Sequence, residues 1–183
     1  MTRWLNQMTL LIREFCPGDE LELSRVFQSS IRELACVDYT AEQIEAWVGA
    51  SLNPELWVIR MRELKPFVVE VNGVIAAYGD LQDHGYIDHF FVSGMYCRQG
   101  LGSMLMNRII EKATTKGIST ITADVSRTAQ RLFSRFGFVL VEERTRTIRD
   151  VVIPNTLMCC DISSLEKMNR KNTSSRFHQS DIL

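Results

Sequence analysis

Several classes of protein are excluded by what this 183-residue sequence lacks. No apolar run approaches the length that crosses a bilayer. The N-terminal stretch MTRWLNQMTLLIREF has neither the apolar core nor the small-residue cleavage site of a signal peptide. The formal net charge is only −1, so no strong basic field favours nucleic acid or an anionic membrane. We therefore expect a cytoplasmic protein that binds neither nucleic acid nor a membrane.

Cysteine is sparse and is not arranged as a metal site. The five cysteines are odd in number, with no CxxC motif and no Cys/His spacing of the kind that binds a metal. We expect reduced thiols and no metal. The remaining composition, 45% hydrophobic and 23% charged, is typical of a globular protein of one domain. We predict a single domain over residues 8–162 and a polar, mobile tail over residues 163–183.

Hydrophobic periodicity predicts an α/β (α+β) fold, a mixed sheet with helices on both faces, in the order β-α-α-β-β-β-α-β-α-β-β. Asp19 is the expected N-cap of the first helix. Thr40 and Gln43 have capping-box spacing for the second helix, which Asn53-Pro54 is expected to close. Asn72-Gly73 predicts a hairpin. Strands are expected at 8–15, 67–71, 74–80, 86–92, 120–125, 138–142 and 156–161, with a further short strand as one interpretation of 55–61.

The stretch from Tyr86 to Met106 organises the chain. It reads as a strand, a break at Ser93-Gly94, a glycine-bearing loop and a helix that begins near Leu101. The first amides of a helix have no carbonyl partner, and glycine lets a phosphate approach them closely. The loop, which comprises Arg98, Gln99, Gly100, Leu101, Gly102 and Ser103, therefore predicts an anion site.

Known phosphate loops fit this stretch poorly. A P-loop requires a Lys directly after its last glycine, and Ser103 follows Gly102. The dinucleotide fingerprint requires Gly or Ala where Leu105 stands. A loop that only caps a helix remains an alternative at this point.

Two motifs in this order resemble the GNAT superfamily of N-acetyltransferases. In that family a strand that ends in Val precedes Q/R-x-x-G-x-G/A, and here Val92 precedes Gly100-Leu101-Gly102. Later in the family come a strand, an Asn-x-x-Ala helix start and a Gly-Phe pair. Here the strand corresponds to 118–125, the helix start to Ser126-Arg127-Thr128-Ala129, and the pair to Gly137-Phe138. The sequence departs from the family at Cys97 in place of Gln or Arg, Ser126 in place of Asn, and Phe133 in place of the tyrosine that many members use as a general acid.

The resemblance implies a GNAT-like acyl-CoA N-acyltransferase fold and acetyl-CoA as co-substrate. It places the coenzyme's pyrophosphate on the loop amides, with Arg98 as a cationic helper. It places the pantetheine arm along Phe90, Phe91 and Val92, with a backbone amide near Phe91 as donor to the thioester carbonyl. Ser126 and Phe133 occupy positions that contact the coenzyme in the family.

Acetyl transfer to an amine also requires a base, because an amine with a pKa near 10.4 is almost entirely protonated at neutral pH. Asp88 lies where many family members carry a carboxylate, and His89 has a side chain that titrates near neutral pH. Each also fits a purely structural role. Ser126 and the phenols of Tyr78, Tyr86 and Tyr96 are the candidates near the motif for protonating the leaving thiolate.

The acceptor is expected to be a primary amine of a small molecule or a protein. Arg144, Arg146 and Arg149 near the last strands suit an anionic acceptor or, alternatively, form a solvated edge. A non-catalytic acyl-CoA-binding or sensing module is the alternative function, and a nucleotide-binding α/β protein is a third. The chain is expected to be a monomer or a homodimer.

Overall fold

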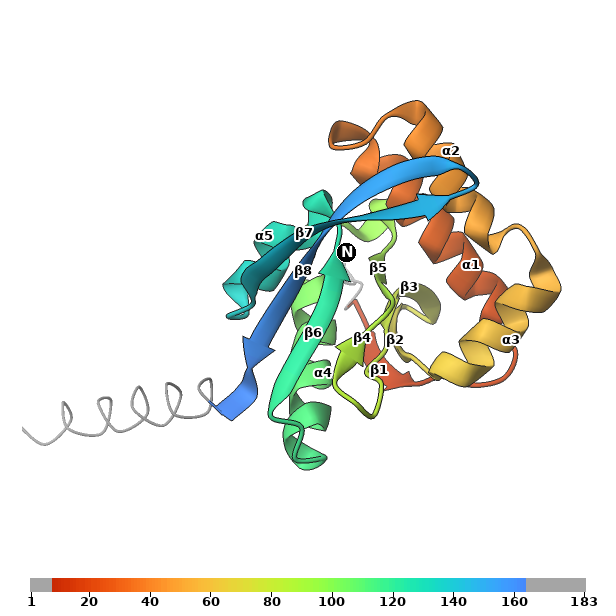
Figure 1. Cartoon of the computed structure of the whole chain (residues 1–183). Helices are drawn as coiled ribbons and strands as arrows, with labels where there is room; N and C mark the ends of the chain where they lie inside the picture. The colour runs from red at the N-terminus through yellow and green to blue at the C-terminus, as the bar shows by residue number, and fades with distance from the viewer. Residues whose placement is uncertain (1–7, 164–183) are drawn as a thin grey trace, which may run out of the picture.

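The structure, a computed structural model, describes residues 8–163 as two four-stranded sheets (Figure 1). The first sheet is antiparallel throughout, and the second is mixed because its β4–β6 pair is parallel. Beyond Ser163, the predicted tail lies outside the described residues. The first sheet has the order β1 (Leu10–Glu14), β2 (Phe67–Val71), β3 (Val74–Gly79), β5 (Phe90–Val92); the second has β4 (Tyr86–Ile87), β6 (Thr120–Val125), β8 (Val151–Asp161), β7 (Val139–Ile148).

Helices cover both faces of the first sheet, as predicted. They are α1 (Glu20–Ser29) and α3 (Pro54–Leu64) on one face and α4 (Leu101–Thr115) on the other, whereas α2 (Ala41–Val48) and α5 (Arg127–Arg135) contact β8 of the second sheet. Val69 and Val71 of β2 belong to the core cluster that contains α4, whereas Val68 belongs to the cluster that contains α1 and α3. Because both faces are covered, β2 is apolar at nearly every position.

A helix replaces the ambiguous segment at 55–61, which corrects the predicted order of elements. Asn53 does not close the preceding helix but opens α3, because its Oδ1 accepts the N–H groups of Glu55 and Leu56, each at 3.1 Å. Pro54 occupies the first helical turn, where its missing N–H costs nothing. The amphipathic pattern of α3 is weak, which explains why periodicity alone did not identify the helix.

The predicted strand at 86–92 is interrupted at Asp88 and His89. Tyr86–Ile87 pairs in parallel with β6, and Phe90–Val92 pairs antiparallel with β3. Asp80 compensates at the break: one of its carboxylate oxygens accepts the N–H groups of Asp88 and His89 at 3.2 and 2.6 Å. The two sheets separate from this point.

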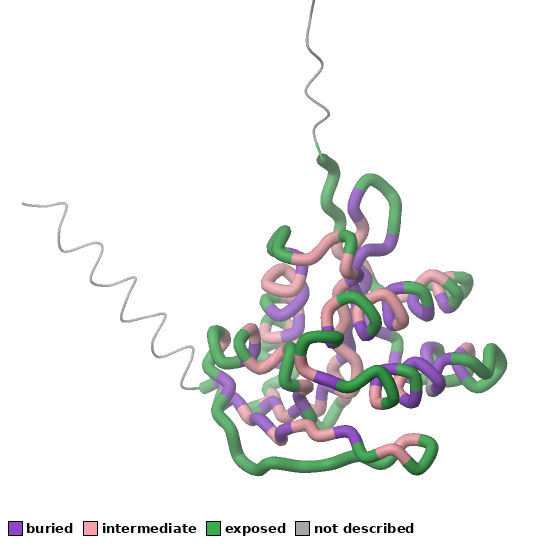
Figure 2. Tube along the Cα trace, turned by 90° about the horizontal axis from the view of Figure 1, so that it is seen from above, coloured by how far each residue is buried: buried purple, intermediate pink, exposed green. Residues whose placement is uncertain are grey.

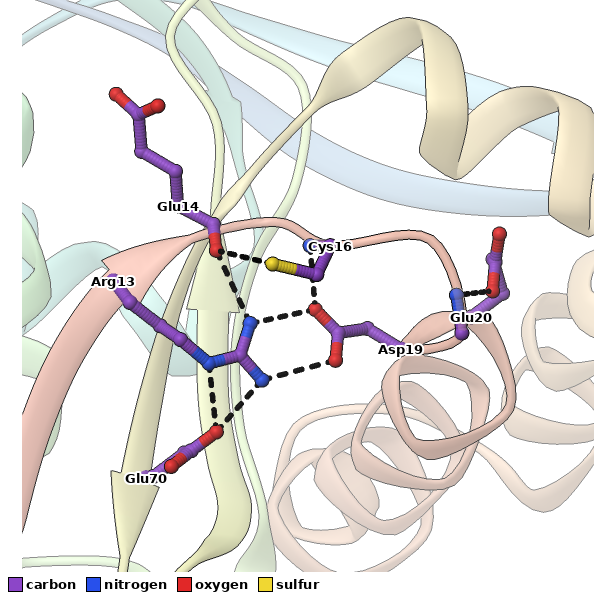
Figure 3. A network of polar contacts seen from close by, with 7 residues as sticks. Arg13, Glu14, Cys16, Asp19, Glu20 and Glu70 are labelled. Atoms are coloured by element: carbon purple, nitrogen blue, oxygen red, sulfur yellow. Dashed lines mark hydrogen bonds and ion pairs between the residues drawn. The ribbon is translucent and has the colours of Figure 1, made fainter.

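Asp19 does not cap α1 with its side chain, which is a second correction. Its carboxylate binds the guanidinium of Arg13 at 2.7 and 2.9 Å and accepts the N–H of Cys16 at 2.8 Å (Figure 3). Arg13 also binds Glu70 of the neighbouring strand at 2.7 Å. Burial alone would raise the pKa of Asp19, but the hydrogen bond from Arg13 lowers it. This ion-pair network joins β1 and β2 to the start of α1.

The last two strands form a longer hairpin than predicted. Its turn residues Arg149 and Asp150 both have left-handed φ angles, 51° and 64°. Figure 1 shows the hairpin reaching α2. There Gln43 Nε2 donates to Val152 O at 2.8 Å, and Arg149 donates to Gly49 O at 3.0 Å. β7 is the long exposed stretch at the edge of the molecule in Figure 2.

No helix within residues 8–163 is long and apolar enough to cross a membrane.

Candidate active site

The glycine loop leads into α4 with the geometry expected of an anion site. Gly100 is the N-cap with φ 86°, and its carbonyl accepts the first bond of the helix, from Met104 N–H at 3.0 Å. The preceding amides of Leu101, Gly102 and Ser103 form no hydrogen bond within residues 8–163. They open onto a cavity of about 650 Å³.

Most of the predicted coenzyme residues line this cavity, which we call the loop cavity. They are Phe90, Phe91, Val92, Arg98, Gly100, Leu101, Gly102, Ser103 and Ser126. Gln99 does not line it; its side-chain amide donates to Met95 O at 3.4 Å. Arg131 and Arg135 of α5 line it as well, which sequence reasoning missed because they lie beyond the family motif. With Arg98, they bring three cations to the rim.

Phe133 lies in the core rather than in the loop cavity. It is 2% exposed, and its ring packs edge-on against Phe90 and Phe138 with centroids 5.2 and 4.9 Å away. It also borders a second cavity on the other side of the split strand. A phenyl ring in this position supports the packing between β5 and α5 and offers no proton.

The edge of β5 that faces away from β3 is open. His89 O accepts from Asp80 N–H, and Ser93 N–H donates to Ala76 O, so the odd-numbered residues of this segment bond to β3. The N–H and C=O groups of Phe90 and Val92 therefore point toward the split between the sheets. This register moves the expected backbone donor from Phe91 to its two neighbours.

The end of α1 forms the opposite wall of the loop cavity. The helix continues as a π-helical turn at Ser30–Leu34, and Ile31 and Leu34 of this turn border the cavity. Ser29 Oγ accepts the N–H of Gly94 at 3.0 Å, which fixes the turn to the beginning of the glycine loop. Such π-helical turns are frequent at functional sites.

The second cavity, which we call the hairpin cavity, has a volume of about 520 Å³ and lies beneath the β7–β8 hairpin. The two cavities share the residues Trp47, Phe90, Phe91, Ser126 and Ala129. They therefore meet at the open edge of β5. A molecule extended along the loop cavity could present its end to a second molecule in the hairpin cavity.

Asp88 and His89 both border the hairpin cavity and contact each other. His89 Nε2 lies 3.4 Å from Asp88 Oδ2, an oxygen that also pairs with Arg60 of α3. His89 Nδ1 lies 3.0 Å from the hydroxyl of Tyr78. Within residues 8–163, no hydrogen bond or ion pair uses the other oxygen of Asp88.

The protonation states of this group follow from burial. Burial lowers the pKa of His89 to about 4, with further lowering by Arg60 and Arg146 and opposition from Asp88. Burial likewise raises the pKa of Tyr78 well above 10. The buried Tyr78 hydroxyl therefore donates to Nδ1 of a neutral His89, and the ring hydrogen lies on Nε2, toward Asp88. Arg60 was missed because the helix that carries it was missed.

The other candidate proton donors are occupied or lie elsewhere. Ser126 is the N-cap of α5, where its Oγ accepts the N–H of Ala129 at 3.3 Å. Tyr86 donates to Asp124 at 3.0 Å, and burial raises the pKa of its phenol to about 12. Tyr96 borders the loop cavity beside the glycine loop, as does Cys97. Within residues 8–163, no group of three or more His, Cys, Asp or Glu side chains could hold a metal ion.

The chain is similar to acetyltransferases in sequence and in structure. Residues 36–151 match the model of the acetyltransferase (GNAT) domain family. The chain is 30% identical over 147 residues to the uncharacterized N-acetyltransferase YafP of Escherichia coli K12, covering 80% of this chain and 93% of YafP. A GCN5-related N-acetyltransferase from Rhodopseudomonas palustris superposes with a TM-score of 0.81 at 26% identity, covering 84% of this chain and 96% of its own. YncA from Salmonella typhimurium, solved with acetyl-CoA, superposes with a TM-score of 0.61 at 19% identity over 84% and 94% of the two chains. The resemblance carried by the glycine loop and the Ser126 motif is thereby confirmed.

Proposed function

The chain belongs to the GNAT acetyltransferase family and is an acyl-CoA-dependent acetyltransferase, and we propose that it transfers the acetyl group of acetyl-CoA to a primary amine by direct attack. The observation that supports this proposal is the meeting of the two cavities at the open edge of β5. One cavity has the chemistry of a phosphate site and the other holds a carboxylate, so donor and acceptor can approach from opposite sides.

The residues of the loop cavity fit coenzyme A. The free amides of Leu101, Gly102 and Ser103 and the cation of Arg98 suit a pyrophosphate. A Cβ at Gly102 would lie 2.9 Å from a methyl group of Leu132, so a larger residue there would require the Leu132 side chain to shift. The outward N–H and C=O groups of Phe90 and Val92 suit the amides of a pantetheine arm. Acetyl-CoA supplies a thioester whose carbonyl carbon forms a bond to the amine nitrogen while the carbon–sulfur bond breaks and its electron pair leaves with sulfur.

Asp88 is proposed as the base that removes a proton from the amine, directly or through one water molecule. Its second oxygen has no partner within the described residues, and its first oxygen pairs with Arg60 and lies 3.4 Å from Nε2 of His89. His89 itself is a weak base, because its pKa is near 4. We assign it the positioning of Asp88, with Tyr78 behind it. Tyr78 and Tyr86 donate elsewhere, which leaves water or the phenol of Tyr96 at the loop cavity to protonate the thiolate.

The first test is calorimetric titration of the protein with acetyl-CoA, with ATP and NAD as comparators. We expect binding of acetyl-CoA alone. Thiol release is then measured with a panel of amines for the wild type and Asp88→Asn. The substitution should lower turnover at least tenfold, because general bases contribute about 10²–10⁴-fold, with affinity for acetyl-CoA unchanged.

Asp83→Asn is the matched control, because Asp83 is an exposed carboxylate that pairs with Lys116 away from both cavities. Unchanged turnover in Asp88→Asn would remove Asp88 from the mechanism. Binding of acetyl-CoA without thiol release for any amine would instead favour a non-catalytic binding or sensing module.

A further inference from the structure

Arg146 of the β7–β8 hairpin is exposed and borders the hairpin cavity. In the strand pairing Arg146 lies opposite Ile153, and Arg144 lies opposite Asn155. Directly opposed residues project from the same face of a sheet. Ile153 is buried, and it borders the hairpin cavity together with Asn155 and Arg146. The cation of Arg146 is therefore presented to whatever enters this cavity.

The charge of Arg146 is not compensated by the protein. Arg60 is paired with Asp88, and Arg144 lies 3.4 Å from Asp124 and 3.0 Å from Glu142. Within residues 8–163, Arg146 forms no hydrogen bond and no ion pair. It is close enough to His89 to lower the pKa of that ring, together with burial and Arg60. Arg146 thus brings a cation without a protein partner into the cavity that holds the proposed base.

A second polar group in the same cavity also lacks a partner. The side-chain oxygen of Asn155 is buried, and no hydrogen bond within residues 8–163 reaches it. Buried polar atoms are almost always hydrogen-bonded in folded proteins. Asn155 and Arg146 project from the same face of the hairpin. They offer a hydrogen-bond acceptor and a cation, which suit the N–H group and the carboxylate of one molecule.

The rest of the cavity wall is aromatic. Phe27, Trp57, Trp47 and Phe91 border it, with Phe27 and Trp57 3% and 5% exposed. Their rings pack directly on one another, for example Phe27 on Trp57 with centroids 5.2 Å apart. The volume of about 520 Å³ is in the range of small-molecule sites.

We propose that the acceptor is a small amine that carries a carboxylate, an amino acid with an apolar or aromatic side chain, and that Arg146 binds this carboxylate. A guanidinium and a carboxylate form two parallel hydrogen bonds, which fix orientation as well as charge. The inference rests on the proposed function and specifies its acceptor. The acceptor nitrogen forms the new bond to the acetyl carbon, the carbon–sulfur bond breaks with its electron pair on sulfur, and one proton passes from nitrogen toward Asp88.

Matched pairs of acceptors test the inference. Phenylalanine, leucine, methionine and tryptophan are each compared with the amine that lacks only the carboxylate, and kcat/KM is measured by thiol release at saturating acetyl-CoA. We expect the wild type to prefer at least one amino acid over its amine by about ten- to a hundredfold, the range expected of a hydrogen bond to a charged group. Arg146→Gln should abolish this preference, because kcat/KM should fall about ten- to a hundredfold further for the amino acid than for its matched amine.

Arg144→Gln is the matched control on the same strand and face, since its charge is already balanced by Asp124 and Glu142. This variant should keep the preference. Binding is followed independently of turnover by the fluorescence of Trp47 and Trp57, which border the cavity, with coenzyme A present and no acetyl group to transfer. Arg146→Gln should weaken binding of the amino acid by about the same factor.

The possible outcomes separate this inference from the function on which it rests. Equal use of amino acids and amines, or an unchanged preference in Arg146→Gln, would overturn the inference and leave the acetyltransferase proposal intact. The same holds if acetyl-CoA binds but no amino acid is acetylated. Failure to bind acetyl-CoA would overturn both.

Discussion

The buried carboxylate of Asp80 should lose its proton near pH 6, and this can be measured as a change in stability. Asp80 is 0% exposed and lies where the strand divides. Burial raises its pKa from 3.8 to about 6, even though the hydrogen bonds from Gln82, at 2.5 Å, and from the N–H of His89 lower it. The folded state, in which Asp80 holds the split strand in place, is therefore more stable when Asp80 is protonated.

The sign and size of the effect follow from this pKa. Between about pH 4 and pH 6 the folded state holds a proton that the unfolded state has released. The corresponding stability is fully present below the unfolded pKa of 3.8 and is lost as the pH rises through 6. A shift of about two units at 1.36 kcal/mol per unit amounts to roughly 3 kcal/mol. Asp80→Asn cannot ionise, and its side-chain oxygen can still accept the two N–H groups.

We expect the free energy of unfolding of Asp80→Asn, relative to the wild type, to rise by about 3 kcal/mol between pH 4 and pH 7. Urea titration followed by tryptophan fluorescence measures it, and taking the difference between the two proteins removes the contribution of other carboxylates. Asp83→Asn is an opposite-sign control, because Lys116 lowers the pKa of Asp83, so that this variant should lose relative stability as the pH rises. A difference that does not change with pH, or that falls, would show that Asp80 stays ionised and would refute the reasoning.

Three further substitutions test other contacts. Tyr78→Phe leaves Nδ1 of His89 without its partner, which should cost about 1–3 kcal/mol and lower Tm by about 2–4 °C for each kcal/mol; calorimetry with an unchanged Tm would contradict this. Ser126→Ala removes the cap of α5 and should cost about 1 kcal/mol in thermal unfolding, whereas Ser126→Asn should not. Gln43→Ala removes the 2.8 Å bond that holds the β7–β8 hairpin to α2, together with the capping-box bond from Thr40 N–H, and should raise KM for the amine by up to about tenfold, with affinity for acetyl-CoA, measured by calorimetry, unchanged.

Elements whose determinants are local in the sequence were predicted correctly. The capping box is present, with Gln43 N–H to Thr40 Oγ1 at 3.2 Å and the reciprocal bond at 3.0 Å. Asn72 and Gly73 have φ angles of 53° and 80°, as a two-residue hairpin requires. In each case the residues that form the structure are neighbours in the chain, so the pattern is visible without knowledge of the fold.

Elements that depend on distant partners were not predicted. Asp19 has the residue type of a cap, but its carboxylate pairs instead with Arg13 of β1, which also pairs with Glu70 of β2. The break at Asp88 depends on Asp80, which directly follows β3. Neither interaction leaves a periodic pattern, because a single charged residue looks the same whether it faces solvent or fills a gap.

The residues of the candidate site likewise divide into those that the sequence could identify and those that it could not. The glycine loop and Ser126 could be identified because they belong to contiguous motifs. The hairpin cavity could be identified only in part: Arg146 was among the arginines expected to suit an anionic acceptor, whereas Arg60 lies on a helix hidden by weak periodicity and Asn155 on a strand that contains a proline. The sequence offered Asp88 and His89 as alternatives for the general base. Only the contact between them suggests that Asp88 is the base and that His89 positions it.

The division of the core into two clusters has a consequence for how such a protein can change over evolutionary time. Ile109 and Ile121 belong to the cluster beneath the glycine loop, whereas Trp57 and Ile153 belong to the cluster beneath the hairpin. Mutations accumulated in one cluster leave the packing of the other largely undisturbed. A lineage can therefore exchange the molecule it modifies by altering the hairpin and α3, while the half of the protein that receives the common donor is inherited intact.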